Sequence, residues 1–126
     1  MSEDENKKVI LAVDDAPENL DVVKGLLSPH YTVKAAINGQ MALKIVEKQS
    51  PDLILLDIRM PGMDGYEVCR TLKANDATAS IPVIFLTGES DVDSEVAAAG
   101  GAGYITKPIE PDNLLAQIQD SLKSNQ

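Results

Sequence analysis

The sequence predicts a doubly wound α/β domain, in which helices cover both faces of a parallel sheet. Five short apolar runs alternate with longer segments whose apolar residues recur at helical spacing. The runs are apolar along nearly their whole length, which is typical of parallel strands buried on both faces. At 126 residues the chain is long enough for a single domain with one core. We therefore expect one domain over residues 1–126, with a flexible start at 1–7 and a polar tail at 124–126.

Each predicted strand is an apolar run, and most predicted helices carry a boundary signal. The strands are expected at residues 9–13, 31–37, 53–56, 83–86 and 104–106. Proline suits the first helical turn, so Pro17 and Pro111 are expected to begin the first and the last helix. Asn38 is the predicted cap of the second helix. Asp64 and Glu67 resemble a capping box at the start of the third helix.

The fourth predicted helix is the weakest of the five. It spans roughly residues 90–99 and ends in a stretch of small residues, Ala-Ala-Ala-Gly-Gly-Ala-Gly. Val92 and Val96 are almost its only large apolar side chains, so little apolar surface is available to hold it on the core. We expect a short helix that is mobile or displaced.

The composition excludes several classes of partner. Twenty acidic residues outnumber eleven Lys and Arg, and the net charge of −9 works against direct attraction to nucleic acid. No apolar run approaches the roughly 20 residues that span a bilayer, and the first residues lack the apolar centre of a secretory signal. We expect no nucleic-acid or membrane partner and a cytoplasmic location. The single cysteine, Cys69, cannot form an internal disulfide and is predicted to pack in the core.

Polar residues follow the predicted strands at the ends that meet on one edge of the sheet. Asp14 and Asp15 come after the first strand, Asp57 after the third, Thr87 after the fourth and Lys107 after the fifth. Ligands of such folds bind at this edge. Each residue also has an ordinary structural role available: helix cap for the acids after the first strand, turn residue for the threonine, solvated or paired charge for the lysine. Their combination predicts a functional site.

Three carboxylates at one edge repel one another, which suggests a bound cation. An all-oxygen ligand set suits Mg²⁺ or Mn²⁺ better than zinc, and the lone His30 offers no other metal site. Because Mg²⁺ commonly binds phosphate oxygens, Lys107 and Thr87 gain a role as charge and hydrogen-bond donor for a phosphoryl group. No glycine-rich nucleotide loop of the GxxxxGK[ST] kind is present. The residues therefore favour phosphoryl chemistry without a nucleotide.

Asp57 ends an apolar strand and stands just before a sharp turn. In that turn Pro61 sets φ and Gly62 tolerates positive φ. A carboxylate can itself act as a nucleophile and form an aspartyl phosphate, and Asp57 is the best placed acid for this. We expect the strand and the turn to display the carboxylate and not to bury it.

Four segments together resemble the receiver domain of two-component response regulators. They are the Asp14-Asp15 pair, LLDIRMPGMDG with Asp57, FLTG with Thr87, and YITKP with Lys107. The resemblance covers nearly the whole chain and implies a chemotaxis-Y-like fold with strand order 2-1-3-4-5. It further implies that Asp57 accepts a phosphoryl group from a histidine kinase or a phosphotransfer protein.

The resemblance also implies how the site would be built. Asp14 and Asp15 would hold Mg²⁺ (or Mn²⁺), with Asp15 and Asp57 as carboxylate ligands and the backbone carbonyl of Arg59 as a further protein ligand. Lys107 would pair with the phosphoryl oxygens. Together with Thr87, these five residues form the predicted catalytic and metal-binding set.

Other positions are implied to act after transfer. Thr87 would turn its hydroxyl to the phosphoryl group, and Tyr104 would move inward and remodel the face of the fourth helix, fifth strand and fifth helix. The peptide bond before Pro108 is expected to be cis, with an ordinary trans turn as the alternative. Arg59 and Glu89 occupy positions that tune access of the hydrolytic water in the family. One hypothesis is that these two residues pair and lengthen the phosphoryl lifetime, and the alternative is two solvated charges.

The predicted function is a signalling switch with intrinsic autophosphorylation and autodephosphorylation, not an enzyme with a separate substrate. A phosphorylation-independent scaffold is one alternative. An aspartate-nucleophile phosphatase of the haloacid dehalogenase type is another, but Arg59 stands where its Asp-x-Asp motif needs an acid. The expected output is a downstream protein or a fused domain, and the expected state is a monomer or a weak phosphorylation-dependent dimer.

Overall fold

The computed structural model describes residues 7–88 and 92–124, which form five parallel strands and the helices that connect them. The strands are β1 (Val9–Val13), β2 (Thr32–Ala36), β3 (Leu53–Asp57), β4 (Val83–Thr87) and β5 (Gly103–Thr106). The helices are α1 (Pro17–Leu27), α2 (Gly39–Lys48), α3 (Gly65–Lys73), α4 (Asp93–Ala99) and α5 (Pro111–Ser124). The sheet order is β2-β1-β3-β4-β5, which confirms the predicted fold.

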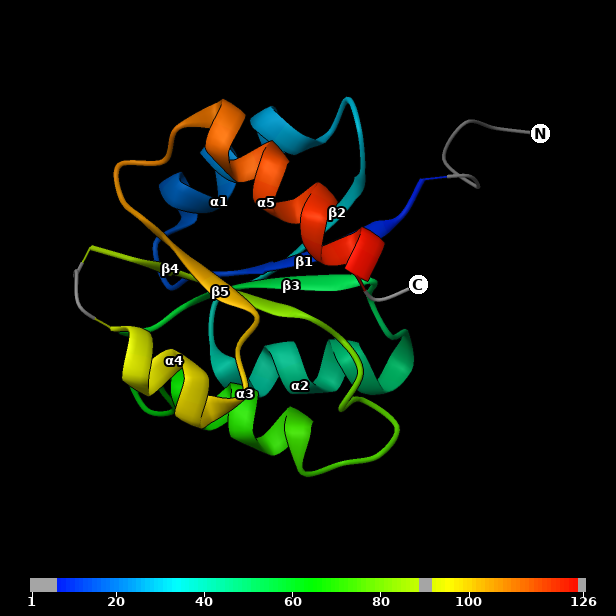
Figure 1. Ribbon diagram of the computed structural model, residues 1–126, viewed down its shortest axis with the longest axis vertical. Coiled ribbons are helices and arrows are strands. Elements are labelled where there is room, and N and C mark those ends of the chain that lie inside the picture. The colour runs from blue at the N-terminus through cyan, green and yellow to red at the C-terminus, as the bar shows by residue number, and fades with distance from the viewer. Residues whose placement is uncertain (1–6, 89–91, 125–126) are drawn as a thin grey trace.

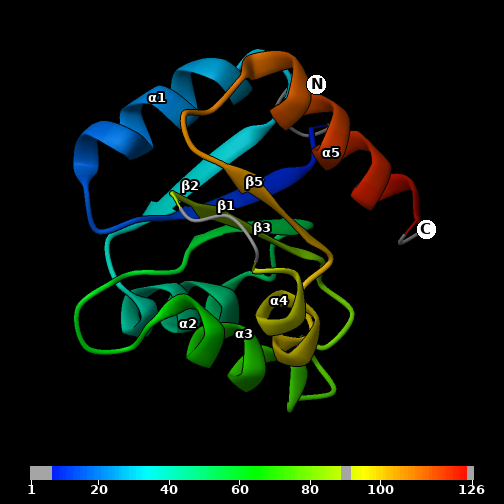
Figure 2. The same ribbon diagram turned by 60° about the vertical axis from the view of Figure 1, so that its left-hand side comes forward.

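The helices form two layers around the sheet, as Figures 1 and 2 show. Helices α1 and α5 lie on one face of the sheet, and α2, α3 and α4 lie on the other. Alternate residues of β3 enter the two resulting cores: Leu53 and Leu55 pack toward α1 and α5, whereas Ile54 and Leu56 pack toward the opposite helices. Burial on both faces explains why this strand is apolar throughout. Within the described residues, no helix has the length and apolar character needed to cross a bilayer.

Several predicted strand ends shift by one residue. Strand β2 is shorter than expected and only half-buried over most of its length, because it is the outer strand of the sheet. Strands β3 and β4 extend to Asp57 and Thr87, since these residues pair with Leu86 and Thr106 of the neighbouring strands. These two predicted site residues are thus held in the sheet and not in the loops that follow it.

The local start signals act as predicted. Pro17 and Pro111 are the first residues of α1 and α5. The side chain of Asn38 accepts a hydrogen bond from the backbone N–H of Met41 at the start of α2. At the start of α3 the side chain of Asp64 accepts one from the backbone N–H of Glu67. Cys69 is fully buried, as expected for a packing residue, and burial raises the pKa of its thiol.

Helix α4 is short, as expected, but it begins at Asp93 and has seven residues. The predicted start near residue 90 falls at residues 89–91, which lie outside the described residues. The helix ends at Gly100, whose φ of 90° provides the left-handed cap that a residue with a side chain adopts only with strain. Val92 and Val96 are buried beneath it. Its mobility or displacement stays a prediction.

Lys73, the last residue of α3, binds backbone carbonyls of the loop between α3 and β4. Its ammonium donates hydrogen bonds to the carbonyl oxygens of Ala79 at 2.9 Å and Ile81 at 2.6 Å. Burial lowers the pKa of this amine, so the bonds are formed at some cost in desolvation. The stem of the side chain lies under Gly100, where an added Cβ would meet Lys73 Cγ at 2.9 Å. One lysine therefore supports both the loop and the end of α4.

Replacing Lys73 with methionine is expected to lower the free energy of unfolding by about 1–3 kcal/mol, because two partly buried carbonyls lose a charged donor while the stem is retained. Urea denaturation measures this difference. The matched control is Lys44→Met on the exposed surface of α2, which we expect to change stability by less than about 0.5 kcal/mol. Equal stability of the two variants would contradict a supporting role for Lys73.

Candidate functional site

The strand ends bring four of the predicted site residues to one edge of the sheet. Asp57 and Thr87 are the last residues of β3 and β4. Asp14 follows β1, and its backbone N–H donates to the carbonyl of Ala36 at 3.1 Å, which continues the ladder with β2. Lys107 follows β5, and its backbone N–H donates to the carbonyl of Thr87 at 2.7 Å. The backbone hydrogen bonds of the sheet and of its strand ends thus position these four predicted site residues.

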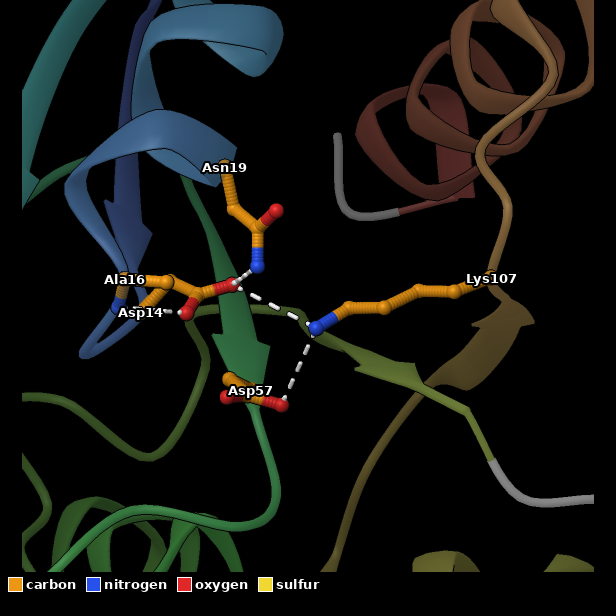
Figure 3. Close-up of polar contacts among 5 residues, drawn as sticks. All are labelled: Asp14, Ala16, Asn19, Asp57 and Lys107. Carbon is orange, nitrogen blue, oxygen red and sulfur yellow. Dashed lines mark hydrogen bonds and ion pairs between the residues drawn. The ribbon is translucent and has the colours of Figure 1, made fainter.

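Lys107 links the two buried acids, as Figure 3 shows. Its ammonium lies 3.4 Å from Asp14 Oδ2 and 3.5 Å from Asp57 Oδ1, although the three residues are far apart in the sequence. The peptide bond between Lys107 and Pro108 is cis, as the resemblance implied. The lysine enters the site from the β5 side and the acids from β1 and β3, so the contacts form only in the folded chain.

The expectation that Asp57 is displayed is wrong. The residue is only 6% exposed, and Asp14 and Thr87 are buried to a similar degree. Asp57 is recessed because Lys107 reaches across it and because the turn after β3 folds back, with the Gly65 N–H donating to the carbonyl of Ile58 at 2.9 Å. Gly62 in that turn has the positive φ, 80°, that its position predicted.

The environment of Asp57 favours a group that neutralises its charge. Burial raises the pKa of this carboxyl, and the negative charge of Asp14 raises it further. Lys107 lowers the pKa by its charge and its hydrogen bond, whereas Asp15 raises it. Because burial and the two acids outweigh the single lysine, the carboxyl binds its proton more tightly than a solvated aspartate.

The three acids have the oxygen ligands and the spacing that a cation site requires. One oxygen of each of Asp14, Asp15 and Asp57 lies within 4.8 Å of the others, and Asp15 is the exposed member. An all-carboxylate oxygen set of this kind suits Mg²⁺ or Mn²⁺. The oxygens of Asp14 already accept hydrogen bonds from the chain itself, which leaves Asp15 and Asp57 as the better direct ligands. The residues present therefore fit the predicted metal.

Asp14 is held by the beginning of α1 and does not cap that helix. Its Oδ1 accepts the backbone N–H of Ala16 at 2.9 Å, and its Oδ2 accepts the side-chain amide of Asn19 at 3.1 Å. The residue before α1 is Ala16, which makes no side-chain cap. Asn19 was not among the predicted site residues. Its position was the available signal, because the third residue of a helix commonly reaches back to the chain before it.

The remaining predicted residues lie around this centre or outside the described residues. Tyr104 is half-buried on β5 and is the register partner of Phe85, whose ring lies 5.2 Å from that of Tyr66. Arg59 is exposed just beyond Asp57. Glu89 falls outside the described residues, so its pairing with Arg59 and the role of both in hydrolysis stay predictions.

The fold and the site agree with the family that the chain matches. Residues 10–119 match the response regulator receiver domain family. The chain is a receiver domain. Among curated relatives, this receiver domain is 40% identical over 124 residues to a probable cyclic di-GMP phosphodiesterase of Vibrio cholerae, covering 97% of the chain and 28% of the relative. It is 37% identical over 113 residues to the response regulator PleD of Caulobacter vibrioides, covering 87% and 25%.

Solved structures match the receiver domain over nearly its whole length. A putative response regulator of Chloroflexus aurantiacus has a TM-score of 0.89 at 29% identity, covering 93% of this chain and 98% of that chain. A chemotaxis protein of Vibrio cholerae has a TM-score of 0.86 at 30% identity, covering 91% and 98%. The receiver domain spans about a quarter of the two curated relatives above and about half of the phosphate regulon regulator PhoB of Pseudomonas aeruginosa, to which it is 38% identical over 92% of the chain.

Proposed function

We propose that this receiver domain is a phosphorylation-controlled switch and that Asp57 is its phosphoacceptor. The contact that carries the proposal is the one between Lys107 and Asp57, 3.5 Å apart at the carboxyl edge of the sheet, beside two further acids. A lone buried acid with a lysine would be an ordinary ion pair. The additional acids add repulsion that a cation and a phosphoryl group would relieve.

The chemistry is a transfer of one phosphoryl group between two nucleophiles. An Asp57 oxygen attacks the phosphorus of a phosphohistidine, forming a new O–P bond while the P–N bond breaks. The imidazole leaves with the bonding electrons and takes up a proton. Lys107 lies where its ammonium would meet the charge that gathers on the phosphoryl oxygens.

Asp14, Asp15, Asp57 and the backbone carbonyl of Arg59 are the proposed site for Mg²⁺ or Mn²⁺. When bound, the ion supplies positive charge that offsets the acids and the phosphoryl oxygens. Asp14 acts mainly by holding Lys107 in the site, because each of its oxygens already accepts a hydrogen bond. Three carboxylates would repel a negatively charged phosphodonor. The arrangement therefore supports a site at which phosphoryl transfer requires a bound divalent ion.

The switch itself is assigned to Thr87 and Tyr104. Thr87 is buried at the end of β4 beside the Asp57 strand, so its hydroxyl is near the position that a phosphoryl group would occupy. Tyr104 lies on the adjacent strand and borders a hollow of about 350 Å³ together with residues of α4 and α5. A change at Thr87 would thus reach the surface formed by α4, β5 and α5.

The expected donor is a sensor histidine kinase or a phosphotransfer protein, and the expected output is a downstream protein or a fused domain. We place the protein in the cytoplasm and expect it to act as a switch and not as an enzyme with its own substrate. Direct nucleic-acid binding is not expected of this acidic chain, although relatives named as DNA-binding regulators match it over about half of their own length. A monomer or a weak phosphorylation-dependent dimer is the expected state.

Intact mass after incubation with acetyl phosphate and Mg²⁺ tests the proposal. We expect the mass of a single added phosphoryl group, no addition when EDTA removes the metal, and loss of the group on treatment with hydroxylamine, which cleaves acyl phosphates. Resistance to hydroxylamine would place the group on a different side chain. No addition from acetyl phosphate or from phosphoramidate would favour a phosphorylation-independent scaffold.

A further inference from the structure

Asn19 makes a polar contact that the proposed mechanism has not used. It lies in the first turn of α1, and its Nδ2 donates to Asp14 Oδ2 at 3.1 Å (Figure 3). The same oxygen receives the ammonium of Lys107 at 3.4 Å. Asp14 is only 3% exposed, so water can replace this amide only in part. A hydrogen bond to a buried carboxylate is among the stronger ones in a protein.

The hydrogen bonds to Asp14 determine how its carboxylate is oriented. The backbone N–H of Ala16 binds Oδ1, and the amide of Asn19 binds Oδ2, so each oxygen has its own donor. With both donors present, the plane of the carboxylate is defined and Oδ2 faces Lys107. Without the amide, Lys107 would be the remaining donor to Oδ2 among the residues that the structure describes, and that ammonium is shared with Asp57.

Resting on the proposed function, we propose that Asn19 is a positioning residue for phosphoryl transfer. It orients Asp14, and through Asp14 it keeps Lys107 and the cation-binding oxygens in place. Groups that orient a metal-binding set without touching the metal commonly change affinity or activity by about 10- to 100-fold. Asn19 belongs to this class by its contacts.

A direct contact with the phosphodonor is the competing explanation. Asn19 also lines a hollow of about 290 Å³ beside Lys107, together with Val22, Pro108 and Ile109. A donor that entered the site through this hollow would pass the amide. The two explanations differ in their dependence on the donor, because a positioning residue acts on every donor alike.

Metal affinity is the first test, because it requires no phosphodonor. Isothermal titration calorimetry with Mg²⁺ on the whole chain suits a protein without tryptophan. We expect Asn19→Ala and the near-isosteric Asn19→Leu, which both remove the amide donor without adding charge, to bind Mg²⁺ at least about tenfold more weakly. The control is Val22→Ala, which changes the same helix and the same hollow at a residue that is 54% exposed, and we expect its affinity to stay within about twofold of the wild type. Unchanged affinity in both Asn19 variants would overturn the proposal.

Two phosphodonors give the second test. Rates of phosphorylation by acetyl phosphate and by phosphoramidate should fall by the same factor in Asn19→Ala. In this variant the Asp14 carboxylate has lost its fixed orientation, and both donors react at the same altered site. A loss with only one donor would show that Asn19 contacts the donor and would overturn the positioning role. If the wild type accepts no phosphoryl group, the proposed function fails, while the Mg²⁺ titration still decides whether Asn19 orients the acids.

Discussion

Asp57→Asn is expected to abolish phosphoryl incorporation completely and at the same time to make the metal-free protein more stable. The amide cannot attack phosphorus as a carboxylate does, so no mass is added with acetyl phosphate and Mg²⁺. Asp57 lies within 4.8 Å of two other acids, and two like charges at that distance repel by roughly 3 kcal/mol at an effective dielectric constant near 20. Since Lys107 offsets part of this repulsion, we expect a gain of about 1–3 kcal/mol in the free energy of unfolding.

The gain from Asp57→Asn should depend on pH in a defined direction. The pKa of Asp57 is raised in the folded state, so the folded protein binds this proton more tightly than the unfolded chain does. Ionisation of Asp57 therefore costs stability, and the full cost is present above the raised pKa. As the pH falls through that pKa toward the ordinary value of 3.8, the wild type recovers and the difference between the two proteins disappears.

Urea denaturation at several pH values in EDTA measures the difference, and intact mass measures the labelling. Asp21→Asn, an exposed acid-to-amide change on α1, is the control and should alter stability by less than about 0.5 kcal/mol without affecting labelling. Added Mg²⁺ should reduce the difference in the free energy of unfolding between Asp57→Asn and the wild type, because it stabilises the wild type by binding to the folded state. Labelling of the Asp57→Asn protein at the wild-type level would exclude Asp57 as the phosphoacceptor.

Gly65→Ala is expected to destabilise the domain by about 3 kcal/mol, near the upper end of the usual cost of overpacking. A Cβ at this position would lie 2.3 Å from the carbonyl oxygen of Asp57 and 3.0 Å from the Cα of Ile58. Both contacts are with backbone atoms of the strand end, so neither is relieved by a rotamer change. The start of α3 would have to move away from β3, which would also disturb the backbone that carries Asp57.

Gly25→Ala is the matched control. Gly25 is exposed in the middle of α1, and an added Cβ there meets nothing within 4 Å. Alanine is preferred to glycine inside a helix, so this variant should gain about 0.5–1 kcal/mol. Thermal or urea unfolding compares the two. Equal stability of Gly65→Ala and Gly25→Ala would contradict the close approach of α3 to the end of β3.

Much of the fold follows from local patterns in the sequence. Apolar runs of strand length, separated by helical spacing, are sufficient to predict a parallel sheet, because only strands buried on both faces lack polar positions. Asn38 and Asp64 mark helix starts by hydrogen bonds with residues three positions further on, and Pro17 marks one by its fixed φ. Gly62 marks a turn by its own backbone freedom. Such signals can be recognised in the sequence because the interacting atoms belong to residues only a few positions apart.

The site was predictable to the extent that it depends on strand ends. Parallel strands place Asp14, Asp57, Thr87 and Lys107 on one edge whatever the details of packing, and the structure brings these residues there. Their catalytic and switching roles stay predictions that the experiments above address. The burial of Asp57 was predicted wrongly because it depends on Lys107, fifty positions away, reaching across the carboxylate.

By itself, therefore, the sequence determined the strand and helix order, the edge at which the chemistry gathers and the residues that gather there. Only the tertiary structure decided how deeply Asp57 is recessed and that Lys107 lies between Asp57 and Asp14. The physical reason is the range of the interactions. Periodicity, caps and turns act between near neighbours, whereas burial, ion pairing and close packing depend on which distant segments meet in space.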